Sequence, residues 1–289
     1  MEYSNQTLPE GINTSKDNPI KELLKLLAVV VVALAALFWL LGLLADWLAP
    51  QIPFEYEQQL FGEMVPDNAI TDGPVPAYLQ SLTDHLVVQM DMPEGMSIKT
   101  FYVEDPVVNA TAGLGGGLQI NSGLLARMPD ENALAMVIGH EIAHVKLRHP
   151  MRSLGRAAVL AATVAVLSGS TGNSLGDVVI SSAGGLTGIT YTRQQEKTAD
   201  ALGLQAMVGV YGHAGGALEL FDILLAVEKK YGGPRVNFLS DHPISEKRTE
   251  AMIELARERH WALKGRVTPL PDFVAAKAKA GTTATETKQ

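Results

Sequence analysis

The chain has 289 residues, of which 47% are hydrophobic, and it carries a formal net charge of -8. That length allows one sizeable domain with appendages. The negative charge, together with the lack of a basic patch interleaved with aromatic residues, argues against a nucleic-acid partner. The chain contains no cysteine, which excludes disulfides, thiolate zinc ligands and a cysteine nucleophile. A metal site would therefore use His, Asp and Glu.

An uncharged apolar run follows a polar, cytoplasmic tail that we assign to residues 1–21. The run extends from Leu26 to Ala45, and its 20 residues would span about 30 Å as a helix, the thickness of the hydrocarbon core. We therefore predict a transmembrane helix over residues 22–48. A cleaved signal peptide is the main alternative, but the run is longer than a typical signal core and a poor cleavage sequence follows it.

The charges beside this run predict its orientation. Lys16, Lys21 and Lys25 precede it, and the next lysine or arginine after it is Lys99. The positive-inside rule places the N-terminus in the cytoplasm and the rest of the chain across the membrane, which in a bacterium is the periplasm. The sequence thus predicts a single-pass protein of the inner membrane, or of an equivalent membrane facing a non-cytosolic compartment.

Residues 49–75 are rich in proline, and we expect them to be a linker that holds a domain of residues 76–265 away from the membrane. Within this domain, apolar spacing predicts a helix from Pro76 to Met90, and alternation predicts a strand from Ile98 to Val103. The glycines between Gly113 and Gly117 do not have the spacing of a nucleotide-binding loop. They predict instead a turn into a short strand, Leu118 to Ile120, where glycine lets another backbone approach closely.

The stretch His140-Glu141-Ile142-Ala143-His144 reads H-E-x-x-H and lies in a strongly predicted helix that Asp130 caps and Pro150 ends. Two histidines four residues apart share one helix face, so both imidazoles can reach one metal ion. Glu141 is placed to act on a metal-bound water. The alternative is a surface helix with two solvated histidines, and it leaves Glu196 and Asp200 without a role.

A third metal ligand is predicted on the next clear helix, from Gln194 to Val208. Glu196 follows His144 by 52 residues, and three protein ligands are typical of a catalytic zinc site. Asp200 lies on the same helix face and can accept the second ring N–H of a ligand histidine. A Glu-x-x-x-Asp pair is common, so only its combination with H-E-x-x-H makes it specific.

The remaining segments are less distinctive. Two short apolar stretches, Ala157 to Leu167 and Val178 to Ile189, are too short to span a bilayer, and either pack on the domain or dip into the membrane. Helices are expected from Ala214 to Tyr231 and from Ser245 to Leu263. We predict a disordered tail over residues 266–289, whose low-complexity part begins at Lys277.

Four stretches carry a resemblance to a known family. They are Asn109-Ala110 with the glycine run and Gly123-Leu124-Leu125; His140 to His144 with Arg148-His149; Tyr191-Thr192-Arg193 with Glu196 and Asp200; and His242-Pro243 with Arg248. In this order they resemble the membrane-associated zinc endopeptidases of the HtpX/Oma type, which include the CAAX prenyl proteases. The resemblance covers roughly residues 75–260. HtpX itself has several clear membrane spans, so the single strong span here makes the periplasmic or Oma-like members the closer comparison.

The resemblance implies a mainly α (α+β), zincin-like metalloprotease fold with a small sheet, and one zinc ion per chain bound by His140, His144 and Glu196. It also implies that Glu141 is the general base, that His242 stabilises the oxyanion, and that Asp200 and Arg248 support the ligands. Asn109 is implied in substrate binding, although the family pattern has an aromatic residue where this chain has Thr111. We expect an extended substrate to add a strand beside Leu118–Ile120, with this substrate-binding set: Asn109, Gly116, Gly117, Leu118, Gln119 and Ile120.

The sequence therefore predicts a membrane-anchored zinc metalloendopeptidase that acts on polypeptides in envelope protein quality control, with the lipid bilayer as its second partner. Two other classes stay open. One is a chaperone-like or scaffold protein with a vestigial site, and the other is a zinc hydrolase with a non-protein envelope substrate, such as peptidoglycan peptides or lipid-linked molecules.

Overall fold

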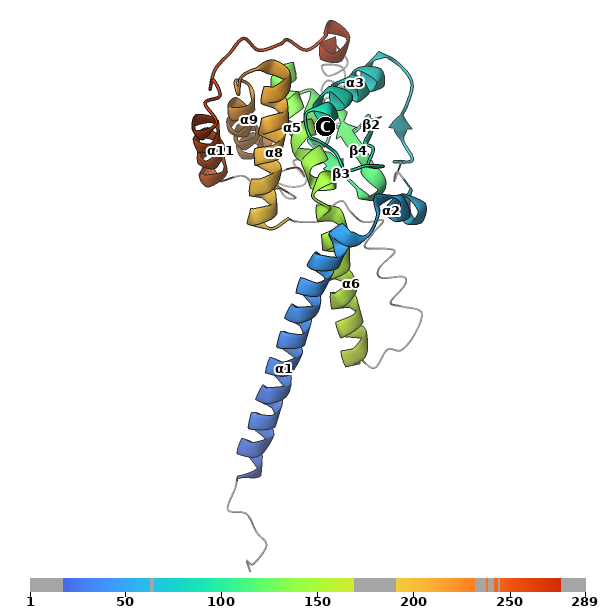
Figure 1. The fold of residues 1–289 in the computed structure, drawn as a ribbon, viewed down its shortest axis with the longest axis vertical. Helices are drawn as coiled ribbons and strands as arrows, with labels where there is room; N and C mark the ends of the chain where they lie inside the picture. The colour runs from blue at the N-terminus through green and yellow to red at the C-terminus, as the bar shows by residue number, and fades with distance from the viewer. Residues whose placement is uncertain are drawn as a thin grey trace, which may run out of the picture.

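The computed structural model describes residues 18–62, 65–168, 191–231, 238, 242–243 and 245–276. These residues form a mostly helical domain around a four-stranded sheet, and one long helix projects from it (Figure 1). The predicted fold class, mainly helical with a small sheet and one N-terminal apolar helix, is confirmed.

The projecting helix is α1, Pro19–Leu48, and it contains the predicted transmembrane segment. Asn18 caps it by accepting a hydrogen bond from the Ile20 N–H, and Pro19 occupies the first turn, where its missing N–H costs nothing. Within the described part of the chain, this is the one helix that is long and apolar enough to cross a membrane.

The segment after α1 is more ordered than a linker. It contains the short helix η1, Ala49–Gln51, and the helix α2, Phe54–Phe61. Phe54 is buried in the main core, and buried Glu57 forms an ion pair with Arg148 and accepts a hydrogen bond from the Gly115 N–H at 2.7 Å. Part of the predicted linker over 49–75 is thus packed into the domain, because two inward-facing residues three positions apart outweigh its proline-rich composition.

The sheet has the order β1-β2-β4-β3. Its strands are β1, Ala69–Ile70; β2, Lys99–Val103; β3, Ala110–Ala112; and β4, Gly117–Asn121. Strands β2 and β4 are parallel, and the two outer pairs are antiparallel. The predicted strands over 98–103 and 118–120 are confirmed. Helix α3, Pro74–Val88, confirms the helix predicted from Pro76.

The position of β4 corrects one prediction. Leu118 pairs with Thr100 on one side and with Ala112 on the other, so the stretch Leu118–Ile120 lies inside the sheet. An extended substrate cannot add a strand there, because both backbone edges of β4 are already paired. The edge strand beside it is β3. The sequence alone did not show that β4 has a neighbour on both sides, because pairing between strands is non-local.

The glycine run does allow the expected close approach. It forms the short helical turn η2, Leu114–Gly116, before β4. A Cβ on Gly116 would lie 2.1 Å from the Ser97 carbonyl oxygen, and the φ of Gly116 is +85°. Both facts require glycine at this position.

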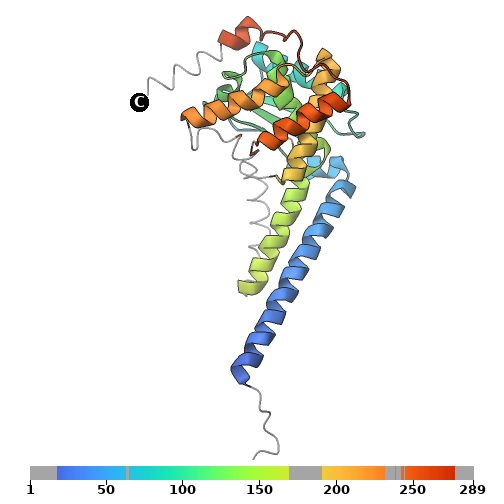
Figure 2. The same ribbon diagram turned by 90° about the vertical axis from the view of Figure 1, so that its left-hand side faces the viewer.

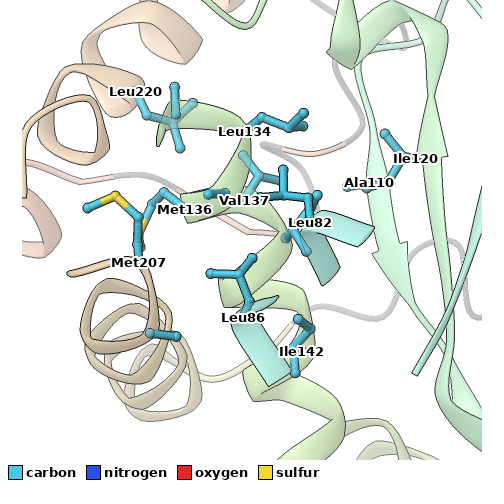
Figure 3. Close-up of a cluster of buried hydrophobic side chains, with 14 of the residues drawn as sticks. Leu82, Leu86, Ala110, Ile120, Leu134, Met136, Val137, Ile142, Met207 and Leu220 are labelled. Carbon is cyan, nitrogen blue, oxygen red and sulfur yellow. The ribbon is translucent and has the colours of Figure 1, made fainter. Parts of the chain in front are cut away.

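Helix α5, Glu131–Lys146, runs through the middle of the core. As predicted, Asp130 caps it by accepting a hydrogen bond from the Ala133 N–H at 2.8 Å. Figure 3 shows α5 between the sheet, which presents Ala110 and Ile120, and the helices that carry Met207 and Leu220. Because both faces of α5 are covered, the H-E-x-x-H stretch is held rigidly and away from bulk water.

Three further helices complete the described part of the domain. They are α8, Arg193–Tyr211; α9, Ala217–Tyr231; and α11, Glu246–Glu258. Helix α8 begins with a capping box between Thr192 and Gln195. It crosses α5 at two glycines, since a Cβ on Gly139 would lie 3.2 Å from Gly203 Cα, and one on Gly203 would lie 2.8 Å from the His140 nitrogen. The two glycines therefore allow the close approach of α5 and α8.

Helix α4, Ser122–Leu125, follows β4, and α6, His149–Ser168, follows α5. The apolar stretch predicted from Ala157 to Leu167 lies in α6, which runs beside α1 rather than in the main core (Figures 1 and 2). The second stretch, Val178 to Ile189, lies outside the described residues.

The predicted disordered tail is wrong at its beginning. Val274 is fully buried in the main core, and the Thr268 carbonyl and N–H pair with the Glu131 N–H and the Asn132 side chain at 2.8 Å each. Thr268 therefore attaches this segment to the start of α5, and Val274 attaches it to the main core. Composition could not reveal this, because a few backbone hydrogen bonds and one apolar residue hold the segment. Residues 277–289 lie outside the described part of the chain.

Candidate metal centre

Three elements bring metal-binding side chains together at one end of the α5–α8 crossing. Helix α5 supplies His140 and His144, α8 supplies Glu196, and His242 comes from the segment before α11. Their ligand atoms all lie within 4.8 Å of one another. Each of these four residues is at most 3% exposed. Buried polar groups that converge in this way need a shared partner.

The distances between the donors fit a single zinc ion. The two Nε2 atoms of His140 and His144 lie 3.0 Å apart. The nearest oxygens of Glu196 are 3.6 Å from His140 Nε2 and 3.4 Å from His144 Nε2. Tetrahedral zinc with nitrogen and oxygen ligands at about 2.0–2.1 Å separates its donors by roughly 3.3–3.4 Å. The residues present therefore match the predicted cofactor.

The Nδ1 atoms of His140 and His144, which face away from the centre, contact neighbouring side chains. His140 Nδ1 lies 3.0 Å from Asp200 Oδ1, which is the position expected for the supporting carboxylate. His144 Nδ1 lies 3.1 Å from His149 Nδ1. When the Nδ1 atoms carry the protons, the Nε2 lone pairs point into the centre, as metal binding requires.

The sequence did not predict the contact between His149 and His144. Arg148 adopts a left-handed conformation with a φ of 59°, which interrupts the helix between α5 and α6 and brings the His149 ring beside His144. Burial lowers the pKa of the His149 imidazole to about 3, so this ring is neutral. A His-x-x-x-x-His spacing with an adjacent Arg is the only signal that the sequence offered.

The protonation states also suit a metal. Burial lowers the pKa of His144 well below its ordinary value, so its imidazole is neutral. Burial opposes the ionisation of Glu196 and Asp200. Hydrogen bonds from His242 to Glu196 and from Arg248 to Asp200, with nearby positive charge, nevertheless hold the pKa of both carboxyl groups below the usual range. Neutral imidazoles and ionised carboxylates are the forms that bind metal.

Arg248 links the ligand-bearing elements. Its Nε and Nη2 donate to the two carboxylate oxygens of Asp200 at 2.8 and 2.7 Å, and its Nη1 lies 2.6 Å from Glu196 Oε2. Nη1 also donates to the carbonyls of His242 and Pro243. The predicted supporting residue thus ties α11 to α8 and to the His242 segment. An open hollow borders it, lined by Tyr191, Arg193 and Lys197.

Glu141 lies between the centre and the edge strand. Its Oε2 accepts a hydrogen bond from the Ala112 N–H of β3 at 2.9 Å. Its Oε1 has no hydrogen-bond partner among the residues that the structure describes, and it lies 3.3 Å from His242 Nε2. Burial raises the pKa of the Glu141 carboxyl, which increases its affinity for a proton. This is the arrangement expected of a group that receives a proton near the metal.

His242 occupies a different position from the one that the predicted oxyanion role suggests. Its Nδ1 lies 3.2 Å from His140 Nε2 and 3.0 Å from Glu196 Oε1, in the place of a fourth donor. Phe238 stacks on its ring with centroids 4.9 Å apart. Four protein donors would complete a tetrahedron, whereas a catalytic zinc needs one open position.

The predicted substrate-binding residues divide into two groups. Asn109 directly precedes the edge strand β3, where its Nδ2 donates to Thr111 Oγ1 at 3.1 Å and its buried Oδ1 makes no hydrogen bond. The others lie in the turn and the central strand and offer no free backbone edge: Gly116, Gly117, Leu118, Gln119 and Ile120. At the outer edge, the Val108 carbonyl accepts a hydrogen bond from the Phe238 N–H at 3.2 Å.

A helix with H-E-x-x-H, a carboxylate from a second helix and a buried carboxyl beside an edge strand define a metallopeptidase of the zincin type. Comparison with known proteins identifies the family. Residues 75–256 match peptidase family M48, and the chain belongs to that family, whose members are zinc-dependent. This confirms the resemblance to the HtpX/Oma type.

Relatives agree with this assignment. The chain is 30% identical to the beta-barrel assembly-enhancing protease of Escherichia coli K12 over 228 residues, which cover 73% of this chain and 44% of that protein. It is 27% identical to the mitochondrial metalloendopeptidase OMA1 of Saccharomyces cerevisiae over 171 residues, which cover 57% of this chain and 49% of that protein. The matched region thus spans less than half the length of these relatives.

Proposed function

We propose that the protein is a membrane-anchored zinc metalloendopeptidase that hydrolyses peptide bonds in protein substrates. The convergence of His140, His144 and Glu196 around one point, with Glu141 beside it, is the observation that carries this proposal. These three residues would hold the zinc ion, which supplies a Lewis acid for the substrate carbonyl and acidifies water.

Glu141 performs the proton transfers in the proposed mechanism. The Ala112 N–H fixes its Oε2 at 2.9 Å, and within the described part of the chain Oε1 makes no hydrogen bond. Oε1 therefore accepts the proton of the attacking water and then delivers it to the nitrogen of the leaving amine. Burial raises the pKa of the Glu141 carboxyl, which favours acceptance of the proton.

Strand β3 is the proposed substrate platform in place of β4. It is an edge strand, and its Ala112 N–H already contacts Glu141, so an extended peptide paired along β3 would pass beside the proton acceptor. Asn109, at the start of this strand, remains a proposed substrate contact. The segment of Phe238 and His242 lies against this edge and must give way when the peptide binds.

His242 is proposed to stabilise the oxyanion once its ring leaves the fourth donor position. Its other ring nitrogen, Nε2, lies 3.3 Å from Glu141 Oε1, so the ring borders the place where the reacting carbonyl would sit. A hydrogen bond to charge that develops in the transition state is worth more than one to the ground state.

The cellular setting is proposed from α1 and from the relatives. Membrane anchoring rests on the length and apolar character of α1, and the lysines before it favour a cytoplasmic N-terminus with a periplasmic catalytic domain. The names of the relatives, a beta-barrel assembly-enhancing protease and a mitochondrial metalloendopeptidase, support a role in envelope protein quality control. An alkaline phosphatase fusion after residue 60 should be active, and an inactive fusion would overturn this orientation.

Cleavage of an unfolded protein by the zinc-loaded, full-length chain tests the proposed substrate class. We expect casein to be cut at internal peptide bonds, which mass spectrometry of the products would show, and we expect a chelator to stop the reaction. Products only from peptidoglycan peptides or lipid-linked substrates would point to the non-protein hydrolase instead. No cleavage with the metal in place would favour the vestigial scaffold.

A further inference from the structure

The C-terminal part of helix α6 is apolar and contributes no residue to the metal centre described above. It leaves the domain at His149 and runs beside α1 in the opposite chain direction (Figures 1 and 2). The two helices approach closely where a Cβ on Gly155 would lie 3.1 Å from the Ala45 Cβ. An apolar cluster that includes Ala49, Met151 and Leu154 joins them at the domain.

A pair of charges marks a common level on the two helices. Arg156 Nε lies 2.9 Å from Asp46 Oδ1, and both side chains are about one third exposed. On the far side of this pair, α1 is uncharged from Ala45 back to Leu26, and α6 is uncharged from Ala157 to its end at Ser168. Along their common direction away from the domain, both helices therefore change from charged to apolar residues at the Asp46–Arg156 pair.

The apolar part of α6 suits hydrocarbon better than water. Leu160 is 53% exposed among half-buried alanines and Val159. The hydroxyl of Thr163 donates to the Val159 carbonyl at 2.8 Å, so the helix itself satisfies this polar group. A lipid environment demands such internal satisfaction, whereas an exposed surface helix in water would ordinarily carry charges on its outer face.

We propose that α6 enters the bilayer beside α1 and that lipid chains cover its outer face from Ala157 onward. The proposal rests on the membrane anchoring proposed above. The run of uncharged, mostly apolar residues on both helices beyond the Asp46–Arg156 pair makes lipid the occupant. The 12 residues of this part are about 18 Å long at 1.5 Å per residue, roughly half of a 30 Å hydrocarbon core.

This insertion places the catalytic centre close to the membrane surface. Helix α6 begins at His149, whose Nδ1 lies 3.1 Å from Nδ1 of the metal ligand His144. Arg156 comes seven positions after His149, which corresponds to about 10 Å along the helix. The proposed substrates are therefore polypeptide segments that lie within a few residues of a membrane surface.

Depth measurements on single-cysteine variants test the insertion, because the chain has no cysteine of its own. Leu160 lies five residues after Gly155, and Leu40 lies five residues before Ala45, so the antiparallel pairing puts them at the same depth. Their exposed fractions are also matched, 53% and 55%. Val88, at the end of α3 and 76% exposed, serves as the water-facing control.

The experiment uses Leu160→Cys, Leu40→Cys and Val88→Cys in the full-length, zinc-loaded chain, each with a nitroxide label, in phosphatidylcholine–phosphatidylglycerol vesicles. Electron paramagnetic resonance then compares collisions with oxygen, which concentrates in lipid, and with a water-soluble nickel chelate. We expect labels at 160 and 40 to favour oxygen and the label at 88 to favour nickel. Circular dichroism confirms that each variant is folded.

Three results would contradict the proposal, and they are distinguishable. A label at 160 that behaves like the one at 88, while 40 stays in lipid, would overturn the insertion of α6 and leave the anchor intact. A label at 160 that meets neither reagent would show a protein partner, such as a second copy, in place of lipid. Nickel access at position 40 would overturn the membrane anchor itself.

Discussion

The four donors at the metal centre come from residues with unequal tasks. Glu196 is the one proposed ligand from α8, and its carboxylate would neutralise part of the charge of a bound zinc ion. We expect Glu196→Ala to lose most of the bound zinc, because two histidines alone leave the site without its third donor. Metal analysis of the purified protein checks this. Glu254→Ala, at an exposed position on α11, should keep its zinc, and full occupancy in Glu196→Ala would remove it as a ligand.

His242 should behave differently. His140, His144 and Glu196 still provide three donors when its ring is removed, so His242→Ala should retain zinc close to one ion per chain. If the ring stabilises the oxyanion, kcat for casein cleavage should fall on the order of 10²–10³-fold. An unchanged or faster rate would contradict that role and would assign His242 to closing the fourth donor position.

Single residues also show where sequence reasoning succeeds. H-E-x-x-H and Glu-x-x-x-Asp are helical spacings, so their side chains face one way whatever the rest of the fold does, and the structure brings Glu196 and Asp200 to His140. His149 escaped prediction because its contact depends on the left-handed Arg148. That backbone conformation follows from packing, and residue types alone do not reveal it.

At the scale of elements, the crossing of α5 and α8 sets the distance between the two halves of the site. A Cβ on Gly203 would lie 2.8 Å from the backbone nitrogen of His140. We expect Gly203→Ala to separate the helices, to destabilise the domain by about 1–3 kcal/mol and to weaken zinc binding. Denaturant titration and zinc affinity measure these effects. Gly42→Ala, a helical glycine with nothing within 4 Å, should change neither, and the same result for Gly203→Ala would refute the crossing argument.

Helix α2 attaches the anchor to the domain through charge. Arg148 pairs with Glu57, donates to the Ile52 carbonyl at 2.9 Å and faces the Phe54 ring at 5.5 Å. Glu57→Gln leaves this buried guanidinium without its counter-ion, so we expect a loss of about 3–5 kcal/mol of stability. Thermal unfolding would show it. The control Glu55→Gln changes an exposed neighbour. Equal melting temperatures for both variants would contradict the attachment of α2 through the Glu57–Arg148 ion pair.

Elements with a strong local pattern were predicted well, and those defined by distant pairing were not. The cap and apolar spacing of α5 are contained in its own residues. The central place of β4 depends on β2 and β3, and the order of α2 depends on Arg148, about 90 residues further along. A short window of sequence around Gly117 includes β3 but not β2, and a window around Glu57 does not include Arg148.

At the scale of the molecule, one apolar helix joins a domain whose metal centre lies near the point of attachment. Figure 2 shows α1 and α6 leaving the domain together. The sequence predicted the anchor and the domain because composition changes sharply between them. It did not predict that residues before and after the predicted domain of 76–265, such as Phe54 and Val274, belong to the main core. The anchor and the catalytic domain are thus a continuous structure.

The central claim is that a zinc ion and Glu141 together cleave peptide bonds. Glu141→Gln keeps the size of the side chain and one oxygen but cannot accept a proton, and Glu141 is not among the proposed ligands. The decisive measurement is zinc content and casein cleavage on the same purified preparations of wild type and Glu141→Gln. We predict about one zinc per chain in both and cleavage by the wild type alone. Casein cleavage by a zinc-loaded Glu141→Gln protein at the wild-type rate would contradict the mechanism.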